Sequence, residues 1–166
     1  MKFSFTNDWH PRTSSFLLGQ ADHRFFFCPD TLHMTIKRSL QFLYLMHLQR
    51  KTLLFVSTRP QCAPFIQSVA QRIDQPYSLG KWIGGRLTNQ KKHPDCIVLF
   101  DPHVEILHEA ALLNIPVVSF FHDARTGNIC ASDPSKQLHY PVPGPYASLS
   151  FMYWFLNLIV KIFPAR

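Results

Sequence analysis

The chain alternates between short, continuously apolar runs and longer segments whose apolar residues recur every three or four positions. The apolar runs have the length of strands and lie at 51–58, 96–100, 115–121 and, more weakly, 138–143. Segments with helical periodicity lie around them, at 31–50, 60–73, 102–114 and 147–163. Strands that are apolar on both faces and alternate with helices are typical of a parallel sheet covered on both sides. The pattern therefore predicts an α/β domain.

The ends of the chain differ from this alternation. Residues 1–24 mix polar and aromatic side chains with little periodicity, which predicts an extended arm ahead of a single α/β domain at 25–166.

The segment 147–163 is almost apolar, but its 17 residues are just short of a membrane span and four polar residues interrupt it. A helix packed on the sheet is therefore favoured over a membrane anchor. The first twelve residues lack the apolar stretch of a signal peptide and the Arg-rich character of an import presequence.

Charge is distributed unevenly along the 166 residues. Residues 1–92 hold 13 of the 17 Lys and Arg residues and 4 of the 10 Asp and Glu residues, a net charge of +9. Residues 93–166 carry −2. An apolar content of 46% excludes a disordered chain. The basic half favours a surface that binds a polyanion over an ordinary solvated surface.

The residues that metal and nucleotide sites require do not occur in the necessary patterns. Four cysteines lie 34 residues apart in unrelated contexts and form no CxxC pair, so we expect no zinc site and mostly buried, reduced thiols. Neither GxGxxG nor GxxxxGK[ST] is present. In "HVEILHEA" the histidines His103 and His108 are five residues apart instead of four, which favours a polar helix face over a metal site.

Two alternatives to a binding protein remain open. Ser119, His122 and Asp123 lie near the end of a predicted strand, where α/β enzymes place catalytic groups, although no GxSxG elbow is present. A small enzyme with a site near His122 and Asp123 is therefore one alternative. A membrane-anchored adaptor that uses 147–163 is the other.

The stretch "KWIGGRLTNQKKHP", residues 81–94, is unusually basic for a connection between two buried elements. Its cations are able to neutralise phosphates, its polar residues are able to hydrogen-bond sugar and phosphate oxygens, and Gly84 and Gly85 permit a close backbone approach. Trp82 has two interpretations, stacking on a base or anchoring the loop in the core. The predicted RNA-binding residues of this loop are Lys81, Trp82, Arg86, Thr88, Asn89, Gln90, Lys91 and Lys92. Further cationic candidates are Arg12, His23, Arg24, Lys37, Arg38 and Arg59.

Five segments in order resemble the second universal protein of the small ribosomal subunit, the S-two family. They are "GQADHRFFFCP" (19–29), "LLFVSTRPQCAPFIQSVAQ" (53–71), "KWIGGRLTN" (81–89), "DCIVLFDPHVEILHEAALLNIPVVSFFHDA" (95–124) and "HYPVPGPYASLSFMYWFL" (139–156). The third is similar to the family's RW-x-GG-T-LTN motif, with Arg86 in place of threonine. His93 and Pro94 follow almost at once, so the long helical hairpin of bacterial members is missing. The short length, high Phe content and altered motifs resemble a mitochondrial form.

The resemblance implies a flavodoxin-like three-layer α/β/α fold with a parallel sheet of about five strands. It implies a structural, non-enzymatic protein of the mitochondrial small ribosomal subunit, without cofactor or metal. Its partners would be small-subunit ribosomal RNA at the head–body junction and neighbouring small-subunit proteins, with messenger RNA nearby. Membrane insertion and homo-oligomers are not expected.

Overall fold

The computed structural model describes residues 16–21, 24–121, 139–144 and 148–163. Its centre is a sheet of five parallel strands in the order β4-β3-β5-β6-β7. The strands are β3 (Leu53–Ser57), β4 (Tyr77–Leu79), β5 (Cys96–Leu99), β6 (Val117–Phe121) and β7 (Tyr140–Pro143). Every residue of β5 and β6 is buried, which explains their unbroken apolar sequence.

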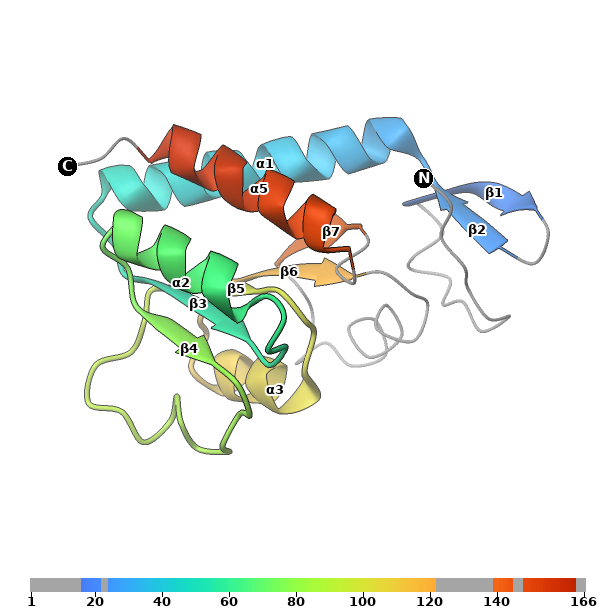
Figure 1. Cartoon of the computed structure of the whole chain (residues 1–166). Helices are drawn as coiled ribbons and strands as arrows, with labels where there is room; N and C mark the ends of the chain where they lie inside the picture. Colours follow the sequence, from blue (N-terminus) through green and yellow to red (C-terminus); the bar gives the residue numbers. More distant parts are fainter. Residues whose placement is uncertain (1–15, 22–23, 122–138, 145–147, 164–166) are drawn as a thin grey trace.

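Helices cover both faces of this sheet, as the sequence predicts (Figure 1). One face carries α1 (Pro29–Leu48), α2 (Ala63–Arg72) and α5 (Leu149–Ile162), whose buried side chains share one apolar cluster. The other face carries α3 (Val104–Leu112), which packs in a second cluster together with Trp82 and Leu87. The fold is therefore a three-layer α/β/α domain, and the predicted fold class is confirmed.

Phenylalanines form a continuous aromatic column through the larger core. Phe100 stacks on Phe120 with ring centroids 5.5 Å apart, and the edge of Phe155 meets Phe120 at 4.7 Å. Phe55 extends the column across β3 at 6.2 Å from Phe100. Stacked and edge-on rings at these separations add to the stability that their burial provides. Much of the high Phe content thus serves packing between the sheet and α5.

Two aspartates flank β5 and bind the two ends of the neighbouring β3. At the start, the Asp95 carboxylate accepts hydrogen bonds from the Thr52 amide at 2.9 Å and from Lys51 Nζ at 3.1 Å. At the end, the buried Asp101 carboxylate accepts from Ser57 Oγ at 2.8 Å, the Thr58 amide at 3.0 Å and the Thr58 hydroxyl. Hydrogen bonds from the two aspartates therefore tie the polar residues at both ends of β3 to the ends of β5.

The predicted boundaries lie within a few residues of the observed ones, with two elements missed. One is the short edge strand β4, whose three residues show no apolar run. The other is an antiparallel hairpin of β1 (Leu17–Ala21) and β2 (Arg24–Phe27), within and just after the stretch predicted to be an extended arm. The edge of Phe27 meets Phe121 of β6 at 5.7 Å.

The described residues also show the end of α3, the state of three cysteines and the lengths of the apolar helices. Asn114 has φ 54° just beyond α3, the left-handed conformation in which asparagine can end a helix. Cys28, Cys62 and Cys96 are free thiols, two of them buried, whereas Cys130 lies outside the described residues. Burial raises the pKa of the Cys96 thiol to about 12. In the described part of the chain, no helix has the length and apolarity required to cross a membrane.

Gly144, directly after β7, provides a test of how closely α5 packs on the sheet. A Cβ atom there would lie 2.5 Å from the Cζ atom of the buried Phe151 ring. We expect Gly144→Ala to lower the free energy of unfolding by about 1–3 kcal/mol, because the ring has to shift within a packed core. Urea denaturation measures the change. Gly84→Ala is the matched control, since a methyl group there would meet nothing within 4 Å and its φ lies outside the left-handed region; equal losses in both variants would contradict the packing argument.

Candidate nucleic-acid interface

The basic loop, residues 80–95, is the crossover between the parallel strands β4 and β5. A connection between parallel strands must cross a face of the sheet, and a helix usually makes that crossing. Here the chain crosses on the α3 side as an irregular segment with turns (Figure 1). Local backbone hydrogen bonds form its turns. The Arg86 amide donates to the Ile83 carbonyl at 3.2 Å, and the Asn89 amide donates to the Gly85 carbonyl at 2.9 Å. An irregular crossover leaves other backbone groups to be satisfied from outside the loop.

The carboxylate of Glu109 on α3 satisfies them. It accepts hydrogen bonds from Trp82 Nε1 at 3.1 Å, from the Gly85 amide at 2.8 Å and from the Leu87 amide at 2.9 Å. Glu109 is buried, with 7% of its surface exposed. Three donors spread over six residues therefore converge on one side chain. This carboxylate fixes the shape of the loop from the inside.

Gly85 occupies a position that only glycine fits without strain. Its φ is +82°, in the left-handed region, and a Cβ atom would lie 2.8 Å from Asn89 Nδ2. Its amide points to Glu109. The second glycine of the pair thus lets the backbone turn toward the carboxylate, whereas Gly84 has open space around it.

The inward half of the loop leaves the predicted RNA-binding side chains on the outside. Trp82 and Leu87 are buried against α3, and the polar and cationic residues before, between and after them are exposed. The exposed set comprises Lys81, Arg86, Thr88, Asn89, Gln90, Lys91 and Lys92. Residues 80–94 of the loop contain no Asp or Glu, and Asp95 at its end is paired with Lys51 and the Thr52 amide. Seven of the eight predicted loop residues are therefore exposed on the surface of this loop.

Trp82 is the exception among the eight, because it is buried. Its ring is 5% exposed, and its Nε1–H donates to Glu109. Both the ring face and the polar atom are therefore engaged within the domain. The guanidinium of Arg86 lies 5.8 Å from the Trp82 ring centroid, within the range of a cation–π contact. The alternative interpretation, an anchor of the loop in the core, is the one that the structure supports.

The other predicted cations do not join this surface. Lys37 and Arg38 are exposed on α1, which covers the opposite face of the sheet. Arg59 follows β3 at the carboxyl edge of the sheet. Arg24 belongs to β2, and Arg12 and His23 lie outside the described residues. The predicted residues therefore fall on at least two separate faces.

Glu109 is the functional residue that the sequence analysis missed. The sequence pattern assigns it to a polar helix face, but it lies on the buried side of α3 beside Ile106 and Ala110. The available signal was its spacing, because Ile106 and Ala110 precede and follow it at helical positions that face the core. A buried glutamate at such a position needs several donors, and the amides of the basic loop supply them.

At the carboxyl edge of the sheet, where α/β enzymes bind ligands, the described ends of β3 and β5 make internal contacts. Between β3 and β5 the connections leave toward opposite faces, which is the usual position of a ligand. Here Asp101 joins the two strand ends through Ser57 and Thr58. Ser119 is fully buried and bonds a backbone carbonyl. His122 and Asp123, the candidate catalytic pair, lie outside the described residues.

Comparisons with known proteins identify relatives of the chain. A model of the family described as ribosomal protein S2 matches residues 4–92, which include the basic loop through Lys92. Small ribosomal subunit protein uS2c of Chlorella vulgaris is 33% identical over 84 residues, covering 51% of this chain and 32% of that protein. Small ribosomal subunit protein uS2 of Marinobacter nauticus is 30% identical over 86 residues, covering 52% of this chain and 34% of that protein.

A relative with longer coverage is small ribosomal subunit protein uS2m of Marchantia polymorpha. It is 29% identical over 157 residues, and the match covers 66% of this chain and 64% of that protein. The chain thus spans between about a third and two thirds of the length of these curated relatives.

Replacing Glu109 tests its role as the organiser of the loop. We expect Glu109→Ala to lower the free energy of unfolding by roughly 2 kcal/mol or more, because buried donors on Trp82, Gly85 and Leu87 lose their acceptor. Urea denaturation and hydrogen exchange of the loop amides measure the effect. Glu105→Ala, at an exposed position of the same helix, is the matched control. Unchanged exchange at Gly85 and Leu87 in the Glu109 variant would show that other contacts hold the loop.

Acidification should release the loop through the same carboxylate. Burial raises the pKa of Glu109, but the hydrogen bonds from Trp82 Nε1 and the loop amides outweigh it and hold the pKa below the ordinary value of 4.5. A lowered folded-state pKa contributes stability that is fully present above the unfolded value and is lost as the pH falls through the folded one.

We therefore expect the loop amides to lose protection below about pH 4.5, as measured by hydrogen exchange over pH 3–6 after correction for the intrinsic rate. Asp95 also has a lowered pKa, caused first by the bond from the Thr52 amide, so global stability falls over a similar range. The control is Glu109→Gln, which cannot ionise. A variant that keeps the full pH dependence at the Gly85 amide would contradict the assignment.

Proposed function

The chain belongs to the ribosomal protein S2 family, and we propose that it is a structural, non-catalytic component of a small ribosomal subunit that binds small-subunit ribosomal RNA through its basic loop. Several small ribosomal subunit proteins among its relatives support the assignment to that subunit. One observation carries the RNA-binding role. Four cations and three polar side chains are exposed on a loop whose backbone is fixed from inside by Glu109.

A fixed cationic loop suits the recognition of RNA shape. Lys81, Lys91 and Lys92 carry charge for phosphates, while Thr88, Asn89 and Gln90 offer donors and acceptors to sugar and phosphate oxygens. Because Trp82 is buried, its indole offers no platform for an unstacked base. This favours recognition of the RNA backbone over the reading of base sequence. Preorganisation by Glu109 lowers the entropy that the loop loses on binding.

We further propose that the particle is the mitochondrial ribosome, and that the protein lies at the junction of head and body near messenger RNA. The uS2m relative, which aligns over more of the chain than the chloroplast and bacterial relatives, supports the mitochondrial assignment. Neighbouring small-subunit proteins are the remaining expected partners, and the chain is expected as a single copy per particle. The position on the particle rests on the family resemblance of the motifs.

Sedimentation of a tagged chain tests both the ribosomal assignment and the RNA-binding role of the basic loop. We expect the chain to co-sediment with the small subunit of a mitochondrial lysate and to leave that fraction after ribonuclease treatment. A triple variant, Arg86→Ala with Lys91→Ala and Lys92→Ala, should bind the RNA more weakly. The slope of log K against log salt should become shallower by roughly 2 to 3 units, because each of the three lost phosphate contacts removes about 0.7 to 0.9 of a unit.

The matched control is Arg72→Ala, which removes an exposed cation from α2 on the other face of the sheet. Failure of the unmodified chain to co-sediment would refute the ribosomal assignment. Co-sedimentation with an unchanged salt slope in the triple variant would refute the role of the loop alone.

A further inference from the structure

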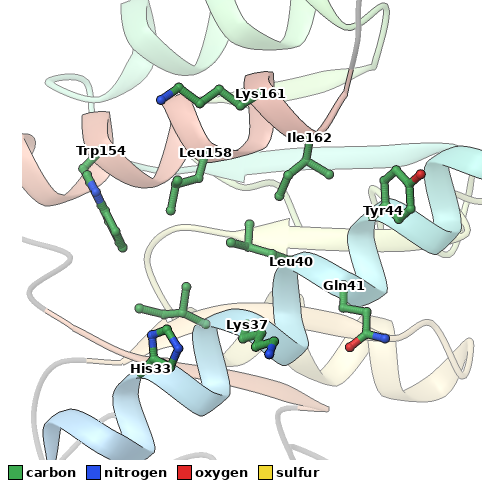
Figure 2. A pocket seen from close by; sticks show the side chains of 10 residues that line it. His33, Lys37, Leu40, Gln41, Tyr44, Trp154, Leu158, Lys161 and Ile162 are labelled. Carbon is green, nitrogen blue, oxygen red and sulfur yellow. The ribbon is translucent and has the colours of Figure 1, made fainter.

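A groove between α1 and α5 lies on the face of the sheet opposite the basic loop (Figure 2). It has a volume of about 810 Å³. Figure 2 shows the aliphatic side chains of Leu40, Leu158 and Ile162 directed into the space between the two helices. Two aromatic residues also line it, Trp154 and Tyr44, which are 47% and 41% exposed. A groove with an aliphatic floor and exposed aromatic side chains along it is a candidate surface for a protein partner.

The residues that line the groove form ridges with a spacing of four. On α5 the ridge is Trp154, Leu158 and Ile162, and on α1 it is Ile36, Leu40 and Tyr44. Rows of side chains spaced by four residues are the ridges that interdigitate when helices pack against each other. The groove between two such apolar rows therefore has the shape and chemistry that a third helix requires.

The rims of the groove are polar, and their charge has one sign. A second row on α1 comprises His33, Lys37 and Gln41, and Lys161 lies on the side of α5. No carboxylate occurs among the ten described residues that line the groove. A helix seated there would bury its apolar ridge against Leu40 and Leu158 and place its flanking residues beside Lys37 and Lys161. Acidic flanks complement these two cations.

We propose that this groove binds an acidic amphipathic helix of a neighbouring protein in the same particle. The inference rests on the proposed ribosomal function for the location of the partner, but not on the basic loop. The floor argues against single-stranded RNA, which takes rows of aromatic platforms with a continuous basic track. Here the floor is mostly aliphatic and two lysines are the permanently charged groups that line it. Lys37, predicted from the sequence to bind RNA, is thereby assigned to a protein contact.

The first experiment uses the purified full-length chain and an 18-residue helical peptide with a Leu and Ile ridge flanked by Glu. We expect binding that weakens with salt and at least ten-fold weaker binding by the double variant Lys37→Glu with Lys161→Glu. The matched control, Arg50→Glu with Arg72→Glu, makes the same change in net charge at exposed positions outside the groove. Circular dichroism establishes that each variant is folded.

Two further probes discriminate between occupants. The same peptide with Lys in place of Glu should bind at least ten-fold more weakly, and a single-stranded RNA oligonucleotide should not compete for the groove. Equal binding of both peptides, loss of binding in the control variant, or displacement by the oligonucleotide would each overturn the proposal.

The second experiment uses isolated small subunits that contain the protein. A carbodiimide joins a lysine amine to a carboxylate in direct contact without adding a spacer. We expect Lys37 or Lys161 to be joined to Asp or Glu of one helical segment in another protein, identified by mass spectrometry. If the chain co-sediments with the subunit while both lysines remain open to amine acetylation, the groove proposal fails and the ribosomal proposal stands. If the chain does not co-sediment, the ribosomal proposal fails, and the peptide experiment still decides the groove.

Discussion

The candidate interface depends on one buried carboxylate. Glu109 lies on a helix whose position is set by the sheet, and it accepts bonds from three groups of the basic loop. Without a crossover helix, only a few turn hydrogen bonds hold the backbone of the loop, and Glu109 supplies an acceptor for amides that those turns leave over. Because the negative charge of Glu109 is used for amides and an indole, it leaves the cations free for an outside partner. A buried carboxylate thus fixes the loop that carries the exposed cations.

The domain separates two kinds of surface by means of the sheet. The α3 face carries the loop, with cations and hydrogen-bonding side chains on a fixed backbone. The α1–α5 face carries a groove with aliphatic ridges and two lysines. The aromatic column of Phe55, Phe100 and Phe120 lies beneath α5 and gives that face a rigid base. A small protein with two chemically different faces is suited to join an RNA to a protein.

The sequence was sufficient to predict the layers, because unbroken apolar strands and periodic helices report burial directly. Contacts that depend on three-dimensional neighbours were not predictable in the same way. Glu109 looks like a surface residue in the sequence since its partners lie 22 to 27 positions away. The two interpretations of Trp82 are separated only by the bond from its Nε1–H to that carboxylate and by its burial. The strand β4 escapes notice because it has three residues at the sheet edge, of which Tyr77 is exposed. Lys37 was grouped with the loop cations because a count of charges along the sequence does not show on which face of the fold each residue lies.

The aspartates at the two ends of β5 have a consequence for how the strands find their alignment. In a sheet that is apolar on both faces, sliding a strand by one residue moves each side chain to the opposite face but leaves an apolar residue there, so the hydrophobic pattern alone does not select one register. Asp95 holds Thr52 before β3, and Asp101 holds Ser57 and Thr58 at its end, so only one offset satisfies both carboxylates. The pairing of Leu53 with Cys96 and of Val56 with Leu99 is the offset that does so. These two residues therefore encode the registration of the central strand pair, information that the hydrophobic sequence between them does not contain.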